Sequence, residues 1–421
     1  MSAAEPERHI EARHVRVASF DIAESGAPLA SLSGLDEIRL LVRSGPAPLG
    51  WLRLSGRGAN VDAEQVASTL LDQLAESLRR EALRRRLSTA ASEPALEPAI
   101  SVVVCTRDRT DSLRRCLESL RDLSYPALEI VVVDNAPSGA ETCALVAAMA
   151  PLFGPSRTLR YAREDRPGLD WARNRGIAES SHDLIAFTDD DVRVDPGWLS
   201  GIARAFADRD VLMVTGLVAP AELDTGAQLD FEDGYGGMGK GFHPIRRQRD
   251  GLTPAALLGA HHLGVGANMA FRRALLDRVG GFDTALDVGT PSHGAGDLEM
   301  FHRVLVSGAV AQYEPSALVW HSHRRDHAGL RRQLRDNGRA FGVYLIGCAL
   351  RRTVPRGVVV RYAVRIWLGW LLGRLARSLV GRDALSPRLR AAELWGAMQA
   401  PWAYWRTRRS DRELRSAAPA E

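Results

Sequence analysis

Cysteine and lysine are both scarce in this chain. Its 421 residues include four cysteines, and no two of them form a Cys-x-x-Cys pair or share the spacing of a structural zinc site. This pattern argues against a disulfide scaffold and fits a reducing cytoplasm. Lys240 is the only lysine, so the remaining Lys/Arg positions are all arginine.

Long apolar runs and targeting signals are also missing. No uninterrupted apolar stretch reaches the ~18 residues that a membrane span needs, and the N-terminal sequence MSAAEPERHIEARH is too polar for a signal peptide. No Gly-x-Gly-x-x-Gly motif follows the first Val/Ile-rich segment, which disfavours a dinucleotide-dependent oxidoreductase. With 45% hydrophobic residues, the chain can bury a substantial core. We expect a cytoplasmic protein with two or three structural units.

Charge is distributed unevenly along the chain. Residues 324–421 carry 21 arginines and seven acidic residues, a balance of +14, whereas the net charge of the whole chain is +4. Five tryptophans share this basic stretch: Trp367, Trp370, Trp395, Trp402 and Trp405. Arginine with tryptophan suits an anionic lipid surface, so one expectation is peripheral contact with the inner face of the cell membrane. The other is a solvated helical bundle packed on the rest of the chain. No nucleic-acid-binding motif accompanies the charge, and no nucleic-acid partner is expected.

Three regions follow one another along the chain. Residues 1–95 predict a small N-terminal α+β unit, and residues 326–421 a basic helical C-terminal region. Between them, residues 96–325 alternate strand and helix patterns, which indicates an α/β fold with a doubly wound sheet flanked by helices. Within the first region the predicted elements are extended stretches at Val15–Ile22, Glu37–Arg43 and Gly50–Leu54, a helix from Asp62 to about Leu87, and a linker over Ser88–Pro98.

The middle region contains both regular and irregular segments. The predicted strands are Ile100–Cys105, Glu129–Val133, Thr158–Ala162, Leu184–Phe187 and Val211–Val218. A helix between the first two has apolar residues at i, i+3, i+4 and i+7, and further helices begin near Asp170 and Pro196. The glycine-rich stretch Glu222–Asp250 lacks periodicity and predicts a mobile loop without regular elements.

Three successive carboxylates, Asp189, Asp190 and Asp191, follow an apolar strand. At a buried strand end they repel one another unless a counter-charge is present. A divalent cation shared with a substrate phosphate supplies that charge, and open α/β sheets place their ligands at such strand ends. A solvated acidic turn is the alternative for an isolated triplet.

Other polar residues follow the neighbouring strands. Thr106 and Arg109 follow the first strand and Asp134 the second, where they could contact a ribose or a nucleobase. Asp297 lies just after Gly294-Ala295-Gly296, at the start of a predicted helix, and could act as a general base. Taken alone, each of the strand-end residues is better explained by turn or helix-cap chemistry, and favourable interaction with the helix dipole is a common alternative for Asp297.

In this order, the motifs resemble the family 2 glycosyltransferases of the GT-A fold. The resemblance covers about residues 99–325 and depends on the segments SVVVCTRDR, IVVVDNAPS, RPGLDWARNRGI, FTDDDVRVDPGWL, GVGANMAFRR, GAGDLEMFHRVLVSG and LVWHSH. It implies a mixed GT-A sheet and a metal-dependent, inverting transfer of a sugar from a nucleotide-diphosphate sugar to a hydroxyl acceptor. The acceptor expected is a cell-envelope or lipid-linked glycan.

The resemblance also assigns roles to individual residues. It implies Asp297 as the catalytic base and Asp191, with His321, as ligands of Mn²⁺ or Mg²⁺. The residues implied for the nucleotide sugar are Thr106, Arg109, Asp134, Arg173, Asn174, Asp189 and Asp190. One departure is Gly296, where many relatives carry Glu. It leaves Glu299 as a competing base, and a plain strand-end residue is an equal alternative for His321. For His261 and His262, a structural role is favoured over one in the acceptor cleft.

Two other functions remain in competition. A non-catalytic saccharide- or lipid-binding scaffold could retain the fold, although Asp191 and Asp297 argue against it. A sugar-phosphate nucleotidyltransferase typically has a glycine-rich basic loop after its first strand, and residues 105–109 contain no glycine. A retaining double displacement is also open, and the sequence does not select among UDP, GDP and dTDP donors.

Overall fold

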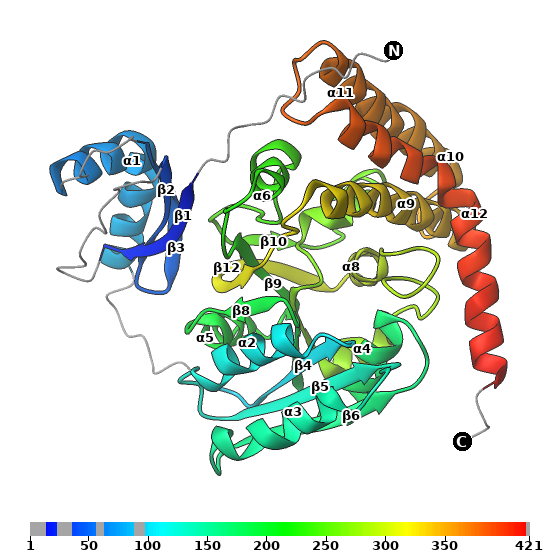
Figure 1. Ribbon diagram of the computed structural model, residues 1–421, viewed down its shortest axis with the longest axis horizontal. Helices are drawn as coiled ribbons and strands as arrows, with labels where there is room; N and C mark the ends of the chain where they lie inside the picture. Colours follow the sequence, from blue (N-terminus) through cyan, green and yellow to red (C-terminus); the bar gives the residue numbers. More distant parts are fainter. Residues whose placement is uncertain (1–13, 23–35, 56–62, 88–96, 418–421) are drawn as a thin grey trace, which may run out of the picture. The chain divides into compact units, whose positions relative to one another are not determined.

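The computed structural model describes residues 14–22, 36–55, 63–87 and 97–417 (Figure 1). The first 13 residues and nearly all of the predicted linker over Ser88–Pro98 lie outside the described residues. Contacts group the described chain into two compact units. The described part of residues 1–93 groups with Pro220–Gly237 and Ser322–Leu330, and the remainder forms the second, larger unit. The division into three domains, with boundaries at residues 95/96 and 325/326, remains a prediction.

The smaller unit contains a three-stranded sheet and a long helix. Its elements are β1 (Val15–Asp21), β2 (Glu37–Ser44), β3 (Ala47–Ser55) and α1 (Ala63–Leu87). β1 pairs in parallel with β2, and β2 pairs antiparallel with β3. Val15 of β1 packs with Leu223 and Leu229 of the later segment. Arg39 of β2 is buried, and its guanidinium binds Glu37 at 2.7 Å and Asp233 at 2.5 Å. Side chains from distant parts of the sequence therefore complete this unit.

The prediction that Glu222–Asp250 lacks regular elements is wrong. The stretch contains α6 (Gly226–Leu229), the π-helix η2 (Asp230–Tyr235) and β10 (Ile245–Arg247). A reciprocal pair of hydrogen bonds caps α6, from Gln228 N–H to Thr225 Oγ1 and from Thr225 N–H to Gln228 Oε1. These elements span three to six residues, which is too short for a periodic pattern to show in the sequence.

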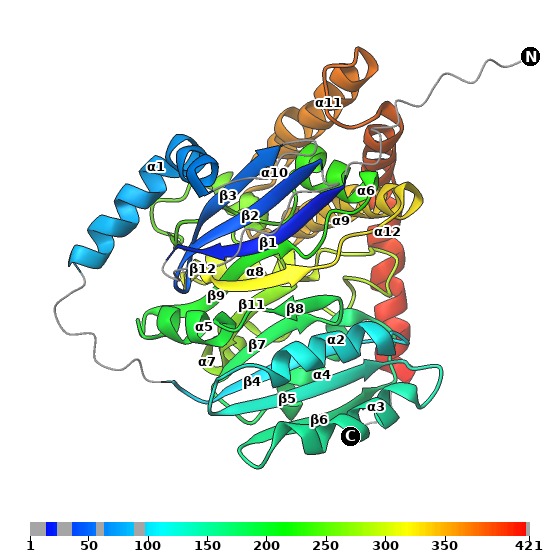
Figure 2. The ribbon, with the colours of Figure 1, turned by 60° about the vertical axis from the view of Figure 1, so that its left-hand side comes forward.

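A nine-stranded mixed sheet forms the centre of the larger unit (Figure 2). Its path runs β10-β12-β9-β11-β7-β4-β5-β6, and β8 pairs with β12. The strands other than β10 are β4 (Ile100–Thr106), β5 (Leu128–Asn135), β6 (Arg157–Glu164), β7 (Leu184–Asp189), β8 (Val192–Val194), β9 (Val211–Pro220), β11 (Asn268–Arg272) and β12 (Val310–His321). β7, β4, β5 and β6 are parallel to one another, whereas β11 runs antiparallel to β7. The five strands predicted for this region are all present.

Helices cover both faces of this sheet because its central strands are apolar on both sides. Val102 and Val104 of β4 pack in one cluster with residues of α2 (Thr110–Arg121), α3 (Glu141–Met149) and α5 (Trp198–Phe206). Val103, on the opposite face, packs with residues of α4 (Leu169–Glu179), α7 (Arg273–Val279) and α8 (Gly296–Val306). Two short 3-10 helices, η1 (Ala150–Phe153) and η3 (Ala256–His262), join these elements. The predicted mixed sheet flanked by helices is confirmed.

The C-terminal region is helical. It contains α9 (His327–Arg351), α10 (Arg356–Arg361), the π-helix η4 (Tyr362–Leu368), α11 (Gly369–Leu379) and α12 (Pro387–Ala417). Glycines let α9 and α12 approach closely. A Cβ atom on Gly396 of α12 would lie 1.8 Å from the carbonyl oxygen of Arg335 in α9. A Cβ atom on Gly338 of α9 would lie 2.1 Å from the carbonyl oxygen of Glu393 in α12. Across the segments that the structure describes, no helix combines the length and the low charge that a bilayer span requires.

Candidate active site

The ends of the parallel strands bring several predicted site residues together. In the sheet register, Thr106 of β4 lies beside Asp134 of β5, and Cys105 lies beside Asp189 of β7. The antiparallel pairing of β8 with β12 places His321 beside Val192. All of these positions belong to the larger unit. The acidic triplet is therefore at a sheet edge shared with residues from three other strands.

Asp190 points into the protein and is held there. Its carboxylate is buried and accepts hydrogen bonds from Thr106 Oγ1 at 2.7 Å and from the Arg109 guanidinium at 2.6 Å. Burial raises the pKa of Asp190 to about 7, although Arg109 opposes this shift. Asp190 thus fixes Thr106 and Arg109 at the strand ends, and its own contacts are with protein groups.

Asp191 lies between Arg109 and His321. One carboxylate oxygen accepts a hydrogen bond from Arg109 at 3.0 Å, and the other lies 3.3 Å from His321 Nε2. Burial acts to raise the pKa of Asp191, but His321 and Arg109 outweigh it and the pKa is lowered. Burial and the charge of Asp191 raise the pKa of neighbouring Asp189 to about 6. Asp191 is therefore the carboxylate of the triplet that is most readily ionised.

Asp191 and His321 fit a divalent cation as a pair of ligands. Two adjacent ligands at ~2.1 Å from an octahedral ion lie about 3 Å apart, and the separation of Asp191 Oδ1 from His321 Nε2 is 3.3 Å. Within the described residues, no group of three or more His, Cys, Asp or Glu side chains is arranged to hold a metal. Divalent cations at phosphate-binding sites can use one or two protein ligands and take the others from substrate phosphates and water.

Asp134 retains a free hydrogen-bond acceptor. Its Oδ2 accepts a hydrogen bond from the Tyr161 hydroxyl at 3.1 Å, whereas its buried Oδ1 has no partner among the described residues. Burial raises the pKa of this carboxyl group. An unsatisfied buried acceptor is costly, and a nucleobase N–H would satisfy it.

Asp297 lies in the first turn of α8, as the sequence predicts. Its carboxylate accepts hydrogen bonds from the backbone N–H groups of Gly266 and Leu298, each at 2.8 Å. Burial and the nearby Asp287 raise its pKa, while Arg173 and the two backbone donors oppose the shift. A partly buried carboxylate with fixed orientation and raised pKa is suited to accept a proton.

Arg173 is a cation that interacts electrostatically with both the acidic triplet and Asp297. It is buried and donates to Asp170 at 2.9 Å and to Asp287 at 2.6 Å. Asp189 and Asp297 also raise the pKa of Arg173, so its charge acts on both the triplet and the predicted base. Neither Asp170 nor Asp287 is among the site residues predicted from the sequence. Asp170 stands within the RPGLDWARNRGI segment, but no pattern in the sequence marks Asp287.

Gly296 leaves room for these two carboxylates. A Cβ at Gly296 would lie 2.1 Å from Asp170 Oδ2 and 2.5 Å from Asp287 Oδ2. Asp170 is fully buried and bound to Arg173, so it has little freedom to move aside. The departure from the family pattern therefore has a local explanation: acidic side chains from two other segments occupy the space beside the helix start.

We expect Gly296→Ala to destabilise the protein and to reduce its activity. Overpacking of this kind costs about 1–3 kcal/mol in folding free energy, and here it also displaces the contacts of Arg173. Thermal denaturation measures the first effect. Gly357→Ala is the matched control, because a Cβ at that helical position meets nothing within 4 Å. An unchanged melting temperature in Gly296→Ala would contradict the packing argument.

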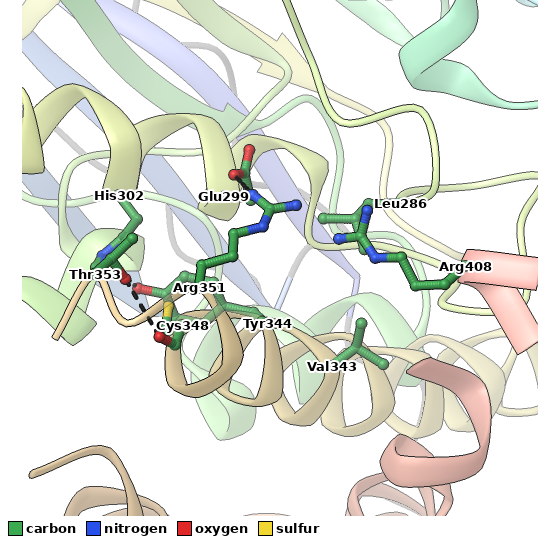
Figure 3. A pocket seen from close by; sticks show the side chains of 10 residues that line it. Leu286, Glu299, His302, Val343, Tyr344, Cys348, Arg351, Thr353 and Arg408 are labelled. Carbon is green, nitrogen blue, oxygen red and sulfur yellow. Dashed lines mark hydrogen bonds and ion pairs between the residues drawn. The ribbon is translucent and has the colours of Figure 1, made fainter. Parts of the chain in front are cut away.

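Glu299 and Asn174 are engaged in other contacts. Glu299 accepts from Arg303 at 2.8 Å and from Arg351, and it lines a pocket together with His302 (Figure 3). That pocket is not lined by Asp297 or by any residue of the acidic triplet. Asn174 uses its amide to bind the backbone N–H and carbonyl of Phe282 at 2.7 and 2.9 Å. A nucleotide-binding role for Asn174 stays a prediction.

Two histidines and the single lysine lie close enough to interact electrostatically, and the lysine also interacts with Asp297. The rings of His261 and His262 are 4.0 Å apart, and burial lowers the pKa of His261 to about 3, which keeps it neutral. Burial also lowers the pKa of Lys240, and Asp297 opposes that shift. His261 further packs against Phe341, which agrees with a structural role.

Comparison with known proteins places this site in context. Residues 101–280 match the model of glycosyl transferase family 2. A pre-mycofactocin glycosyltransferase of Mycobacterium tuberculosis is 29% identical over 301 residues, covering 67% of this chain and 55% of the relative. A glucosyl-dolichyl phosphate glucuronosyltransferase of Haloferax volcanii is 25% identical over 197 residues, covering 44% of this chain and 56% of the relative. The chain thus spans little more than half the length of these relatives.

A solved structure shares the fold. A mannosyltransferase from Pyrobaculum calidifontis, in complex with GDP-Man and Mn2+, aligns with 80% of this chain and 97% of its own length. The TM-score is 0.50 and the sequence identity 19%, so the comparison concerns the arrangement of helices and strands.

Proposed function

From the membership of residues 101–280 in glycosyl transferase family 2, with a GT-A fold, we propose that this chain transfers a sugar from a nucleotide-diphosphate sugar to a hydroxyl acceptor with inversion. The observation that carries the proposal is the linked set of carboxylates at the strand ends. Asp191 is paired with His321, Asp297 is held by two backbone N–H groups, and the charge of Arg173 interacts with both Asp189 of the triplet and Asp297.

Each part of the set has a chemical task. Asp134 accepts a hydrogen bond from the base, and Thr106 and Arg109 line the same part of the site, fixed by Asp190. Asp191 and His321 would hold Mn²⁺ or Mg²⁺, whose charge stabilises the diphosphate leaving group when it is bound. Arg109, whose guanidinium binds Asp191, supplies a further positive charge near that group.

Asp297 is the proposed general base. Its Oδ atoms are oriented by backbone donors, so it can take the proton of an acceptor hydroxyl as the oxygen attacks the anomeric carbon. One base opposite the leaving group gives a single displacement and therefore inversion. Glu299 is bound by two arginines and lies in a different pocket, which supports Asp297 for this role.

We propose a cell-envelope or lipid-linked glycan as the acceptor. The dolichyl phosphate relative named above is one support, because its printed name describes a lipid-linked substrate. A second support is the basic C-terminal region, whose charge favours acceptors at an anionic membrane surface. The chain is proposed to act in the cytoplasm, with peripheral contact to the inner face of the membrane.

Donor binding and hydrolysis across a panel of UDP-, GDP- and dTDP-sugars test the proposal. We expect one nucleotide class to bind, with affinity that rises in Mn²⁺ or Mg²⁺ and falls in chelator. The stereochemistry of the product, followed by NMR, should show inversion. If no sugar nucleotide binds under either condition, the transferase proposal is wrong and a non-catalytic scaffold with a retained fold becomes the better description.

A further inference from the structure

The long C-terminal helix α12 carries an exposed aromatic stripe. The stripe consists of Trp395, Met398, Trp402 and Trp405, whose exposed fractions are 54, 64, 56 and 56%. Their spacing of three, four and three residues places them on one face of the helix. The opposite face is buried through Ala397, Ala400, Ala403 and Thr407. Because a folded chain normally buries Trp, a row of three exposed indoles calls for a partner.

Arginines accompany the stripe. The guanidinium of Arg406 lies 4.7 Å from the Trp402 ring centre, and that of Arg409 lies 5.7 Å from the ring of Trp405. Such stacking keeps the cationic group over the face of the indole, so that both can lie at the level where lipid headgroups meet the acyl region.

The adjacent helical segment has the same character. α11 packs beside the first half of α12 (Figure 1). Its Trp370 is 44% exposed and stacks with Arg374 at 5.2 Å. Further exposed apolar side chains of α10, η4 and α11 are Val360, Val364, Ile366, Leu372 and Leu379. Trp367, in contrast, packs against Phe341 at 5.3 Å and is partly buried, so it is not part of this surface.

We propose that the aromatic stripe of α12, together with exposed residues of α11, binds the surface of an anionic bilayer. The partner follows from charge complementarity, because residues 324–421 carry a balance of +14. A second copy of this chain is disfavoured as the partner, since a two-fold contact would bring the same positive region against itself. An amphipathic helix with Trp on one side and Arg beside it lies in the membrane plane without crossing the bilayer, in agreement with the lack of a membrane-spanning helix among the described residues.

Vesicle flotation of the full chain tests this surface without any donor or acceptor. We expect binding to vesicles of phosphatidylcholine with phosphatidylglycerol at low salt, and weak binding to phosphatidylcholine alone or at high salt. The triple variant Trp395→Ser/Trp402→Ser/Trp405→Ser should lower partitioning by roughly tenfold or more. Leu152→Ser is the matched control, because Leu152 is an exposed apolar side chain of η1, outside the C-terminal helices.

A charge variant measures the contribution of the arginines separately from that of the tryptophans. Arg406→Glu/Arg409→Glu should weaken binding by roughly 25-fold or more, since each arginine near an anionic surface contributes about fivefold. Arg114→Glu/Arg115→Glu on exposed positions of α2 controls for total charge. Melting temperatures verify that each variant folds.

Three outcomes would overturn the inference: wild-type protein that does not float with anionic vesicles, a triple tryptophan variant that floats as well as wild type, or a wild-type dimer that the tryptophan variant converts to a monomer. The last result would assign the stripe to contact between copies. None of these results bears on donor binding, so the transferase proposal is judged separately.

Discussion

Asp297→Asn should abolish turnover while leaving donor binding nearly intact. The substitution removes the proton acceptor but keeps the volume of the side chain and one oxygen for the backbone donors of Gly266 and Leu298. Loss of a general base typically lowers the rate by about 10²–10⁴-fold. Steady-state kinetics with calorimetry for the nucleotide sugar measures both quantities.

The matched variant is Glu299→Gln. Because Glu299 is bound by Arg303 and Arg351, this change should affect stability before it affects chemistry. If Glu299→Gln were inactive at unchanged melting temperature and Asp297→Asn were active, the base would have to be reassigned.

The pH dependence gives a second test of the same assignment. Burial and Asp287 raise the pKa of Asp297 above the ordinary value of 3.8. A base acts in its deprotonated form, so kcat/KM falls as the pH drops through this raised pKa. Asp189, with a pKa of about 6, adds a loss of donor binding as the pH falls through that value. In Asp297→Asn, the rate of the chemical step should no longer fall at low pH, whereas donor binding should still weaken there.

Asp191→Ala should eliminate metal-dependent binding of the donor. The variant removes the most readily ionised carboxylate of the triplet and leaves His321 without its 3.3 Å partner. We expect roughly 100-fold or greater loss of affinity in Mn²⁺, to the level that wild-type protein shows in chelator.

Asp190→Asn serves as the comparison, because Asp190 contacts Thr106 and Arg109 and not His321. Asp190→Asn should still bind the donor more tightly in Mn²⁺ than in chelator, even if its affinity is lower than that of wild type. A wild-type protein that binds and turns over the donor equally well in chelator would contradict the assignment of Asp191 and His321 to a metal.

The sequence predicted those parts of the molecule whose signals are local. Continuous Val/Ile runs located the central strands, and the apolar spacing of Leu113, Cys116, Leu117 and Leu120 located α2, where all four residues are buried. The grouping of Thr106, Asp134 and Asp189 could be anticipated because parallel strands end at one edge of the sheet.

What the sequence could not predict depends on long-range packing. Asp287 joins Arg173 across 114 positions, and its surroundings in the sequence resemble an ordinary turn. The effect of Gly296 is visible only once Asp170 and Asp287 are seen in the space that a side chain would need. The elements within Glu222–Asp250 were missed because they are too short to be periodic.

The composition of the smaller unit has a consequence for synthesis. Val15 packs with Leu223 and Leu229, and Arg39 pairs with Asp233 across 194 positions. The unit also includes Ser322–Leu330. As the chain leaves the ribosome, its N-terminal strands, which end at Ser55, must therefore wait until Pro220–Gly237 and Ser322–Leu330 have been synthesised before their partners emerge. During that interval an apolar strand and a buried arginine lack their native contacts. Chaperone demand and expression yield should therefore depend on translation through these segments, and a fragment that ends before Pro220 would carry the strands without Leu223, Leu229 and Asp233.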